Sequence, residues 1–230
     1  MKAVIMAGGL GKRLEPFTKV IPKPLLPVGE KSILELIIQR LKAFGCDEVI
    51  IATNYKSDLF EKYLNPAELG VKITFSKEDE PLGTGGPLKL VRDKLTEPFI
   101  VMNGDILTTI DFNKLKETHL KSGAQLTVCS KEIEMPLHYG VLESKDGIIV
   151  DSVREKPSIK AEINAGIYMV NPETVDKMPN GFYNMTDLIR DLLTNKEIVA
   201  KHAIQEYWLD IGHMGTYEKA QKDIENGLLK

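Results

Sequence analysis

The chain forms its first apolar run at Ala3-Val4-Ile5-Met6 and passes at once into Ala7-Gly8-Gly9-Leu10-Gly11-Lys12-Arg13-Leu14-Glu15-Pro16. A buried strand is therefore expected to lead into a turn that holds three glycines and is followed by two cations. Glycines let a main chain approach a ligand closely and point successive N–H groups at phosphate oxygens. The spacing matches neither the Walker A loop nor the dinucleotide fingerprint. Taken alone, the stretch predicts either a phosphate-binding turn or an ordinary tight turn.

Composition and charge set the broad class of protein. The 230 residues are 43% hydrophobic and 27% charged, a normal globular balance with ample material for a core. The net charge of −3 argues against a broad surface for nucleic acid. No signal-like segment and no run long enough to cross a membrane stands out in the sequence. We therefore expect a cytoplasmic protein that binds neither nucleic acid nor membranes.

The cysteines and histidines predict no zinc site and no disulfide framework. Cys46 and Cys129 lie in apolar surroundings, and we expect them to be buried thiols in a reducing compartment. The histidines are scattered, and we expect them at the surface or behind a site rather than in it: His119, His138, His202 and His213.

The first half of the chain alternates strand-like and helix-like segments. Ser32 and Glu35 form a capping box for a helix that runs to about Phe44, and continuous apolar runs predict buried strands at 49–53 and 99–102. The other expected segments are helices at 57–64, 87–94 and 111–123 and strands at 71–75 and 125–130. This alternation predicts a mostly parallel sheet with helices on both faces.

The second half of the chain differs in character. Residues 141–143 and 148–150 flank Asp146-Gly147 and predict a hairpin. The other expected segments are strands at 162–170 and 198–204, a helix at 186–193 and a closing helix from about Gly215. Because no linker, repeat or low-complexity stretch divides the chain, we expect one domain over residues 1–230 with two lobes, 1–130 and 131–230.

Two aspartates emerge from apolar runs beside a glycine. Asp105 follows Gly104 at the end of an expected strand, and Asp210 stands in Trp208-Leu209-Asp210-Ile211-Gly212. In an open α/β sheet, ligands bind outside the carboxyl ends of the strands. Mg²⁺ prefers carboxylate, phosphate and water oxygens. Each aspartate alone could be a turn residue, but two of them in a chain with a phosphate-cradling turn predict a magnesium site.

Two further segments carry charges on restricted backbone. Lys23 stands between Pro22 and Pro24, which suits a point charge aimed at a polyphosphate, although a solvated loop lysine is the plainer alternative. Glu155-Lys156-Pro157 repeats this pattern of a lysine beside a proline. Its carboxylate could accept sugar hydroxyls and its ammonium could bind a second phosphate. Alternatively, Glu155 and Lys156 are only a charge pair at the surface. The loop at 78–86 is both acidic and glycine-rich. Because carboxylates repel phosphates, the loop is better suited to binding a nucleobase. Alternatively, it is only a flexible segment that leads into the next helix.

The order and spacing of these motifs resemble the sugar-1-phosphate nucleotidyltransferases, or nucleotide-sugar pyrophosphorylases, over nearly the whole chain. The branch most similar in appearance makes GDP-hexoses. The motifs are Ala7–Leu14, Pro22-Lys23-Pro24, Glu80–Gly86, Gly104-Asp105, Glu155-Lys156-Pro157, Asn164-Ala165-Gly166-Ile167-Tyr168 and Trp208–Gly212. The resemblance implies a Rossmann-like three-layer sandwich with a small mixed β second lobe. It also implies Mg²⁺-dependent transfer of a nucleotidyl group from an NTP to a sugar 1-phosphate, with release of pyrophosphate.

The resemblance also implies roles for individual residues. Arg13 and Lys23 would act on the polyphosphate as catalytic cations, and Asp105 and Asp210 would be the metal ligands. The base and ribose would be held by Ala7, Gly8, Gly9, Gly11, Glu78, Gly83 and Thr84. The sugar phosphate would be held by Gly140, Glu155, Lys156 and Asn164.

The nucleobase and the acceptor are less closely specified. A carboxylate at Glu78 has only acceptors and matches the adjacent N1–H and N2–H₂ donors of guanine, so GTP is favoured over UTP or dTTP. Two alternatives remain open: a CTP-dependent enzyme with a non-sugar acceptor such as phosphocholine, and a non-catalytic homologue that senses nucleotide sugars. The resemblance leaves room for a homodimer, for which Phe182-Tyr183 and Leu188-Ile189 offer apolar side chains unless these belong to the core.

Overall fold

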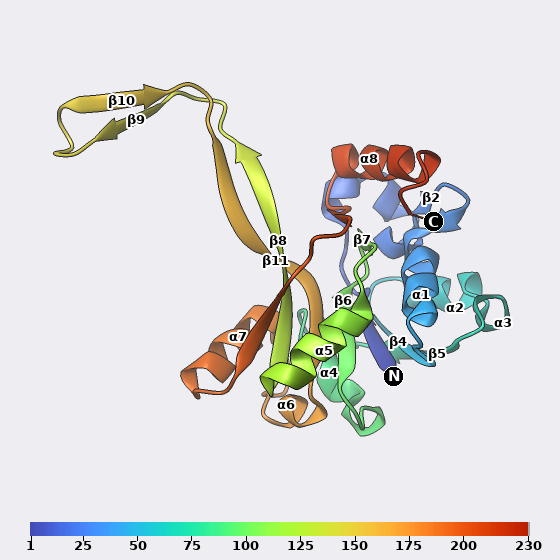
Figure 1. Cartoon of the computed structure of the whole chain (residues 1–230). Helices are drawn as coiled ribbons and strands as arrows, with labels where there is room; N and C mark the ends of the chain where they lie inside the picture. Colours follow the sequence, from blue (N-terminus) through green and yellow to red (C-terminus); the bar gives the residue numbers. More distant parts are fainter. Residues whose placement is uncertain (230) are drawn as a thin grey trace.

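The computed structural model describes residues 1–229. Within these residues, seven strands form one central sheet in the order β12-β8-β11-β6-β1-β4-β5 (Figure 1). All neighbouring pairs are parallel except those of β11, which runs antiparallel to β6 and to β8. The strands are β1 (Lys2–Met6), β4 (Glu48–Thr53), β5 (Lys72–Lys77), β6 (Phe99–Asn103), β8 (Leu126–Pro136), β11 (Ser158–Val170) and β12 (Val199–Ala203). The mostly parallel α/β sheet expected from the sequence is confirmed.

Helices cover both faces of the sheet, because successive side chains of a strand point to opposite sides. Ala3 and Ile5 of β1 pack into one core cluster, and Val4 between them packs into a second. The first cluster includes side chains of α1 (Ile33–Ala43), α2 (Ser57–Tyr63), α5 (Phe112–Ser122) and α8 (Met214–Glu225). The second includes side chains of α4 (Pro87–Leu90), α6 (Pro172–Asp176) and α7 (Met185–Thr194). The result is a three-layer sandwich.

Short elements connect these layers. Two-residue strands β2 (Pro27–Val28) and β3 (Lys31–Ser32) pair with each other, and β7 (Ile106–Thr108) pairs with β13 (Trp208–Asp210). The remaining elements are α3 (Pro66–Leu69) and the 3₁₀ turns η1 (Lys12–Leu14), η2 (Phe17–Lys19), η3 (Lys23–Leu25) and η4 (Arg92–Lys94). No helix within residues 1–229 combines the length and the apolar character that a bilayer crossing requires.

One expected helix is interrupted. The segment 87–94 forms α4 and then η4, with Val91 between them at φ −119° and ψ 9°. The Arg92 guanidinium donates to the carbonyl oxygen of Leu95 at 2.8 Å and pairs with Asp176 at 2.7 Å. These side-chain bonds stabilise a tighter turn here, which helical periodicity alone does not reveal.

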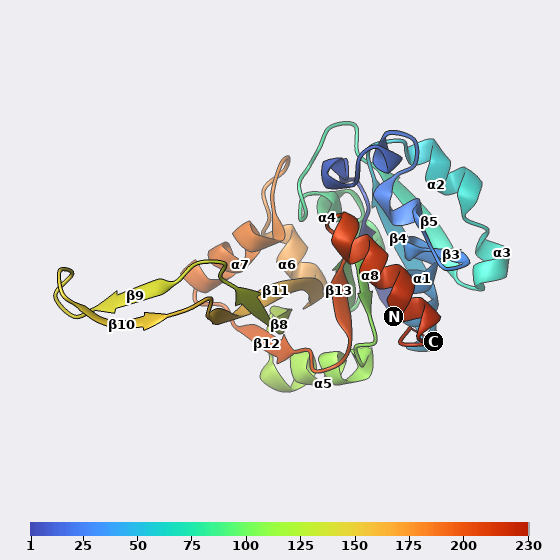
Figure 2. The same ribbon diagram turned by 90° about the horizontal axis from the view of Figure 1, so that it is seen from above.

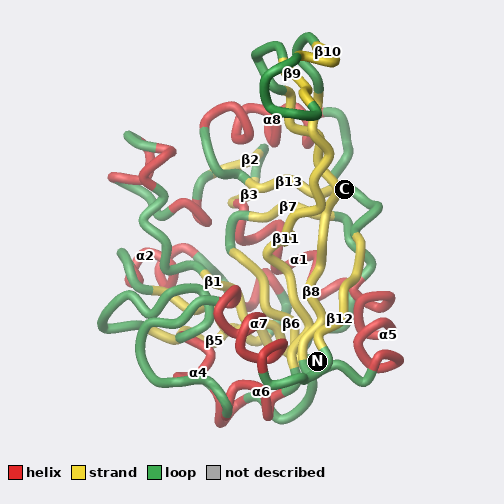
Figure 3. Tube along the Cα trace, turned by 90° about the vertical axis from the view of Figure 1, so that its left-hand side faces the viewer, coloured by secondary structure: helices red, strands yellow, loops and turns green. Residues whose placement is uncertain are grey.

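The strands β8 and β11 are longer than expected and continue beyond the body of the molecule (Figure 3). Within the described residues, β12 pairs with β8 only as far as Ser130, and β6 pairs with β11 only from Ile167 onward. Beyond those points the two strands form a two-stranded ribbon. At its end, β9 (Val141–Ser144) and β10 (Val150–Arg154) form the expected hairpin, which projects far to one side (Figure 2). We call residues 131–163 the arm.

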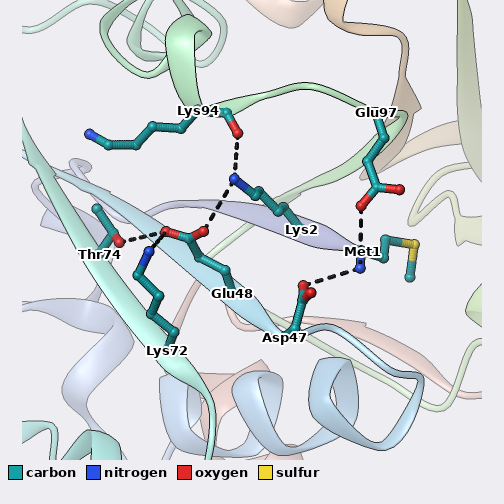
Figure 4. A network of polar contacts seen from close by, with 8 residues as sticks. All are labelled: Met1, Lys2, Asp47, Glu48, Lys72, Thr74, Lys94 and Glu97. Carbon is teal, nitrogen blue, oxygen red and sulfur yellow. Dashed lines mark hydrogen bonds and ion pairs between the residues drawn. The ribbon is translucent and has the colours of Figure 1, made fainter.

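Charged residues join the strands at the amino ends of β1, β4 and β5 (Figure 4). Glu48 of β4 accepts from Thr74 at 2.8 Å and pairs with Lys2 at 3.2 Å and with Lys72 at 3.1 Å. Burial by itself would raise the pKa of Glu48, but the hydrogen bonds from these three partners together lower it. The network therefore stabilises the sheet at the edge opposite to the carboxyl ends of these strands.

The last helix returns to the first part of the chain. Tyr217 of α8 donates to the carbonyl oxygen of Pro27 at 2.6 Å, and Gln221 donates to the same oxygen at 2.8 Å. Figure 1 shows α8 lying across the amino-terminal segments. This return places β13, just before α8, beside β7.

Candidate active site

The two predicted metal ligands lie at one end of the strand pair β7–β13. In the antiparallel pair β7–β13, Asp210 is opposite Ile106, the residue that follows Asp105. The backbone N–H of Ile211 donates to the carbonyl oxygen of Asp105 at 2.9 Å. Two carboxylates from distant parts of the sequence are therefore side by side at the carboxyl end of β6.

Lys23 is the direct partner of Asp105. Its ammonium nitrogen lies 2.6 Å from Asp105 Oδ2, and the lysine residue is only 8% exposed. It stands in η3, directly after Pro22 and before Pro24, so its backbone is held in one conformation. The other carboxylate oxygen, Asp105 Oδ1, is buried and has no hydrogen-bond partner. An unpartnered buried oxygen carries a large desolvation penalty, which a bound cation would relieve.

Asp210 also experiences an excess of negative charge. Burial, and next the charge of Asp105, raise the pKa of the Asp210 carboxyl above its ordinary value, against the opposing charges of Lys23 and Arg13. A side chain added at Gly212 would place its Cβ 3.3 Å from Asp210 Oδ2 and 3.5 Å from the Arg13 guanidinium. The guanidinium therefore reaches the neighbourhood of Asp210 across Gly212. A divalent cation beside the two carboxylates would offset this negative charge.

The glycine turn lines a cavity of about 270 Å³, here called the turn cavity. Gly11 has φ +63°, and a Cβ there would lie 2.9 Å from Thr18 Cγ2 and 3.1 Å from Lys23 Cβ, so only glycine fits without displacement. The cavity is lined by Met6, Ala7, Gly9, Gly11, Lys12, Arg13, Lys23, Pro24, Gly104, Asp105 and Gly212. It therefore joins the predicted turn, both predicted cations and one predicted metal ligand.

A second cavity, of about 370 Å³, contains five of the seven residues predicted to hold the base and ribose, and we call it the Glu78 cavity. The other two, Ala7 and Gly11, line the turn cavity instead. Glu78 is 5% exposed, accepts the backbone N–H of Leu82 at 2.9 Å, and has Oε1 beside Gly8. Burial raises the pKa of Glu78, while the Leu82 N–H lowers it by a smaller amount. The cavity is lined by Met6, Gly8, Gly9, Leu10, Asn54, Glu78, Pro81, Gly83, Thr84, Asn103, Asp105 and Phe182.

A third cavity, of about 340 Å³, contains Asn164, and we call it the Asn164 cavity. Asn164 donates to the hydroxyl of Tyr168 at 2.8 Å and accepts the backbone N–H of Gly166 at 3.0 Å. Burial raises the pKa of Tyr168 to about 12, so this hydroxyl keeps its proton. The cavity is lined by Thr84, Asn103, Ile106, Ile163, Asn164, Ala165, Gly166, Tyr168, Thr186, Trp208 and Asp210.

Shared residues connect the three cavities. Asp105 lines both the turn cavity and the Glu78 cavity, and Asn103 and Thr84 line both the Glu78 cavity and the Asn164 cavity. The carboxylate pair lies where the three meet, with Asp105 in the first two and Asp210 in the third. The arrangement could bind an elongated, phosphate-containing ligand with its middle beside the carboxylates.

Three predicted sugar-phosphate residues lie elsewhere. Gly140, Glu155 and Lys156 are exposed at the joint between the ribbon and the hairpin of the arm, and none of them lines the three cavities. They are neighbours of one another, since a Cβ on Gly140 would lie 3.1 Å from Glu155 Oε2. The extended first half of β11 separates them from Asn164. In this conformation the structure therefore brings Asn164, but not these three residues, to the carboxylate pair.

Several residues that line the cavities were not predicted from the sequence. Asn103, at the end of β6, lines two cavities, and the signal was present as a polar residue ending an apolar strand. Phe182 is 66% exposed and lines the Glu78 cavity. Of the apolar side chains offered for a dimer, Tyr183 and Leu188 are buried in the core of this chain.

The histidine prediction was wrong for one residue, and the predicted burial of the two cysteines is confirmed. His119 is buried because Thr127 and Asn171 each bond one of its ring nitrogens at 2.9 Å. Both cysteines are free and buried. Among residues 1–229, no group of three or more His, Cys, Asp or Glu side chains competes with the carboxylate pair for a metal ion.

Comparison with known sequences places the chain in a family. The sequence profile of the family described as Nucleotidyl transferase matches residues 2–227. A mannose-1-phosphate guanyltransferase of Yarrowia lipolytica is 37% identical over 220 residues, which cover 92% of this chain and 61% of the relative. A mannose-1-phosphate guanylyltransferase catalytic subunit beta of Dictyostelium discoideum is 36% identical and covers 100% of this chain and 68% of the relative. The chain thus spans about three fifths of the length of the Yarrowia protein.

Solved structures agree with this placement. HddC from Yersinia pseudotuberculosis has a TM-score of 0.78 and 29% identity, over 97% of this chain and 99% of that one. The same protein has been solved in complex with GMP-PN, with a TM-score of 0.77 and 27% identity to this chain. With the family profile over nearly the whole chain and a fold shared end to end, the chain belongs to the nucleotidyl transferase family.

Proposed function

We propose that this chain transfers a nucleotidyl group from GTP to a hexose 1-phosphate in the presence of Mg²⁺, and releases pyrophosphate. The observation that carries the proposal is the position of Lys23, Asp105 and Asp210, with an unpartnered carboxylate oxygen at the junction of three cavities. The names of the relatives, mannose-1-phosphate guanylyltransferases, support the same reaction.

Asp105 and Asp210 are the proposed ligands of Mg²⁺. Because these are only two carboxylates, phosphate and water oxygens would complete the coordination. When bound, the ion would neutralise charge on the phosphate oxygens and fix their geometry. Asp105 accepts a hydrogen bond from Lys23 through Oδ2, so the unpartnered Oδ1 remains available to the cation.

The triphosphate is assigned to the turn cavity. The backbone from Ala7 to Gly11 approaches it closely, and Lys12, Arg13 and Lys23 provide positive charge along its wall. Sugar-phosphate oxygens are already anionic nucleophiles, so the reaction requires no general base. What the site must do is bring two anions together in line at the α-phosphorus, and the fixed cations reduce their repulsion there.

The base is assigned to the Glu78 cavity and the sugar to the Asn164 cavity. Glu78 accepts the backbone N–H of Leu82 through Oε2, and its Oε1 remains available to N–H donors such as those of guanine. The solved complex of HddC with GMP-PN supports a guanine nucleotide. In the Asn164 cavity, Asn164, Thr186 and Asn103 offer hydrogen bonds to sugar hydroxyls. Residues 1–130 would then form mainly the nucleotide lobe and residues 131–230 mainly the sugar-phosphate lobe.

Gly140, Glu155 and Lys156 remain proposed sugar-phosphate ligands. For them to reach a ligand beside Asn164, the arm must change its conformation or its position relative to the cavity, since they line none of the three cavities in this structure. Lys156 stands at φ +45°, an unusual backbone conformation at the joint of the arm.

Pyrophosphate release tests the proposal. The purified chain is incubated with Mg²⁺ and each of GTP, UTP, dTTP, CTP and ATP, in combination with mannose 1-phosphate, glucose 1-phosphate or phosphocholine. We expect release with GTP and a hexose 1-phosphate. Faster release with UTP or dTTP would refute the base assignment, and release with phosphocholine would refute the acceptor class.

A chain that releases pyrophosphate with none of these pairs, yet binds a nucleotide sugar by calorimetry, would be a sensor rather than an enzyme. Asp105→Asn is the matched variant. In an enzyme it should abolish release while the protein remains folded, and its failure to do so would remove Asp105 from the mechanism.

A further inference from the structure

A short exposed segment joins two of the proposed phosphate cations. Arg13 lies in η1 and Lys23 in η3, and residues 15–21 run between them through η2. We call residues 15–21 the strap. Within the strap only Thr18 is buried, so the core supports it at a single point. The position of the strap therefore depends on hydrogen bonds more than on packing.

On its inner side the strap is anchored by Thr18. The Thr18 hydroxyl donates to the carbonyl oxygen of Gly11 at 3.0 Å, and the residue is 2% exposed. A Cβ added to Gly11 would lie 2.9 Å from Thr18 Cγ2 and 3.1 Å from Lys23 Cβ, so the three residues are packed against one another. Gly11 and Lys23 both line the turn cavity. A shift of Thr18 would therefore displace the wall of that cavity.

On its outer side the strap is anchored by Lys56, from the loop between β4 and α2. The Lys56 ammonium donates to the carbonyl oxygen of Val20 at 2.9 Å and also to that of Lys19. Both carbonyls stand at the end of η2, where a helical turn leaves its carbonyl oxygens without partners and a cation is favourable. Within residues 1–229, these are the only hydrogen bonds that join the strap to residues outside 11–26.

The backbone of Lys56 is unusual as well. It stands at φ +54° and ψ +40°, in the left-handed region that residues with a Cβ rarely adopt. Such conformations persist where the surrounding structure holds them, and they gather at functional sites. Two residues earlier, Asn54 lines the Glu78 cavity and donates to the carbonyl oxygen of Glu78 at 3.1 Å. The loop 54–56 thus contacts Glu78 at one end and the strap at the other.

Lys56 itself is not placed to bind the nucleotide. It lines none of the three cavities, and its ammonium is directed to the two carbonyl oxygens of the strap. Any effect of this lysine on the proposed phosphate site must therefore pass through the strap.

We propose that Lys56 is a positioning residue for the triphosphate, and that it acts by holding the strap against the glycine turn. Its ammonium fixes the carbonyls that directly follow Thr18. Thr18 in turn holds Gly11, which together with Lys23 forms part of the wall of the turn cavity. The proposal rests on the proposed function, because it assigns to Lys56 a part in the same phosphate site.

Lys56→Met tests the role of the ammonium, because methionine keeps the Cβ and an unbranched stem. We expect KM for GTP in pyrophosphate release to rise about tenfold, since a misplacement of 1 Å can cost about 10²-fold. KM for the hexose 1-phosphate should not change, because the Asn164 cavity contains no residue of the strap or of the glycine turn. Lys56→Arg keeps a cation with N–H donors and should restore most of the loss. A fall of kcat alone, with both KM values unchanged, would overturn the proposal.

A double-mutant cycle tests the route through Thr18. Thr18→Val removes the bond to Gly11 and keeps the shape of the side chain. If Lys56 acts through Thr18, the two losses overlap, and KM for GTP in the double variant should be close to that of the worse single variant. A value equal to the product of the two changes would overturn the proposal, because Lys56 would then act by another route.

The matched control is Lys62→Met. Lys62 is an exposed lysine of α2 that forms no hydrogen bond or ion pair with the part of the chain that the structure describes. Its replacement should leave both KM values as they are in the unaltered chain. A rise of KM for GTP equal to that in Lys56→Met would mean that overall positive charge, and not the anchor, is responsible, and it would overturn the proposal.

Two further measurements separate this proposal from the proposed reaction. Hydrogen exchange needs no substrate: the amides of residues 19–21 should exchange faster in Lys56→Met than in the unaltered chain, at an equal melting temperature. Magnesium tripolyphosphate carries neither base nor sugar, and calorimetry should show that the variant binds it about tenfold more weakly. If the unaltered chain releases no pyrophosphate with any substrate pair, the reaction is refuted while these measurements still decide the role of Lys56. Equal exchange, or equal affinity for tripolyphosphate, would overturn that role.

Discussion

Lys23 Nζ lies 2.6 Å from Asp105 Oδ2, although 82 positions separate the two residues in the chain. The pair stands at the junction of the turn cavity and the Glu78 cavity, and its geometry leaves Asp105 Oδ1 buried without a partner. The lysine thus holds one oxygen of the carboxylate and leaves the other available to the Mg²⁺ ion proposed above. Residues that act by charge and position, without proton transfer, are sufficient for the reaction proposed here.

Replacing Lys23 should reduce turnover more than binding. In Lys23→Ala the phosphate loses a fixed cation and Asp105 loses its partner, so we expect kcat to fall by about 10²-fold or more, the usual scale for one electrostatic stabiliser. Steady-state pyrophosphate release measures it. Lys19→Ala is the control, since Lys19 is exposed and pairs only with Glu15. Near-normal kcat in Lys23→Ala at saturating Mg²⁺ would exclude the lysine from the mechanism.

Glu78 should determine the choice of base. The carboxylate matches the N1–H and N2–H₂ donors of guanine, and ITP lacks the second donor, so GTP should be preferred over ITP by about tenfold or more in kcat/KM. Glu78→Gln should reduce that preference, whereas Glu80→Gln, at an exposed neighbour, should leave it unchanged. An unchanged GTP to ITP ratio in Glu78→Gln would contradict the assignment.

Phe182 should contribute to nucleotide binding by contact with the base. Its ring lines the Glu78 cavity but is largely exposed in the structure without ligand. Stacking of a base on an aromatic ring is worth about 1–3 kcal/mol, so Phe182→Ala should raise KM for the nucleotide about fivefold or more. The melting temperature should stay constant because little core contact is lost. Leu193→Ala, at a leucine that is 57% exposed and lines none of the three cavities, is the control, and equal KM values in the two variants would refute the role.

Gly83 should be needed for packing as well as for its conformation. Gly83 and Gly123 both have positive φ, +79° and +63°. They differ in their surroundings: a Cβ added to Gly83 would lie 2.7 Å from the carbonyl oxygen of Tyr183, whereas a Cβ added to Gly123 would meet nothing within 4 Å. Gly123→Ala should cost only backbone strain, about 1–2 kcal/mol. Gly83→Ala should cost more in urea unfolding and should also weaken nucleotide binding. Equal losses of unfolding free energy would mean that the loop moves aside freely.

The Glu48 network should make stability depend on pH. Since the folded pKa of Glu48 lies below its ordinary value, the carboxylate stabilises the fold above the unfolded pKa, and this contribution is lost as pH falls through the folded pKa. Glu48→Gln should therefore lower the free energy of unfolding by roughly 1–3 kcal/mol near pH 7 and by progressively less in acid. Urea unfolding at several pH values measures this loss of free energy.

The matched variant for this measurement is Glu117→Gln, whose carboxylate forms only an exposed pair with Lys121. It should change the unfolding free energy little at any pH. A loss in Glu48→Gln that persists undiminished in acid would show that packing, and not charge, is what the network contributes.

Local signals were sufficient for most elements. The capping box of Ser32 and Glu35 begins α1 as predicted, Gly123 ends α5 in a left-handed conformation, and apolar runs became β4 and β6. The rule that ligands bind beyond the carboxyl ends of strands correctly predicted that Asp105 and the glycine turn lie close together. Each of these features depends on neighbours in sequence or on a general property of parallel sheets.

Other features depend on contacts between distant residues. The break at Val91 follows from Arg92 reaching Asp176, and the burial of His119 follows from Thr127 and Asn171 on other elements. Phe182 lies at the Glu78 cavity because the loop before α7 is hydrogen-bonded to the loop at 82–86. The Tyr183 N–H, for example, donates to the carbonyl oxygen of Leu82. No pattern within either loop contains that information.

By itself, the sequence determined the α/β class, the glycine turn and the types of charge that the candidate site residues carry, because periodicity, capping and charge type are local properties of the chain. The tertiary structure alone decided that Lys23 occupies one oxygen of Asp105, that β13 returns Asp210 to its side, and that residues 140, 155 and 156 lie on an arm away from Asn164. The physical reason is that the direction of a two-stranded ribbon and the register of distant strands are set by packing over the whole molecule. A bulge between Asn164 and Tyr168 and the end of pairing at Ser130 direct the arm outward, and neither is encoded in a motif.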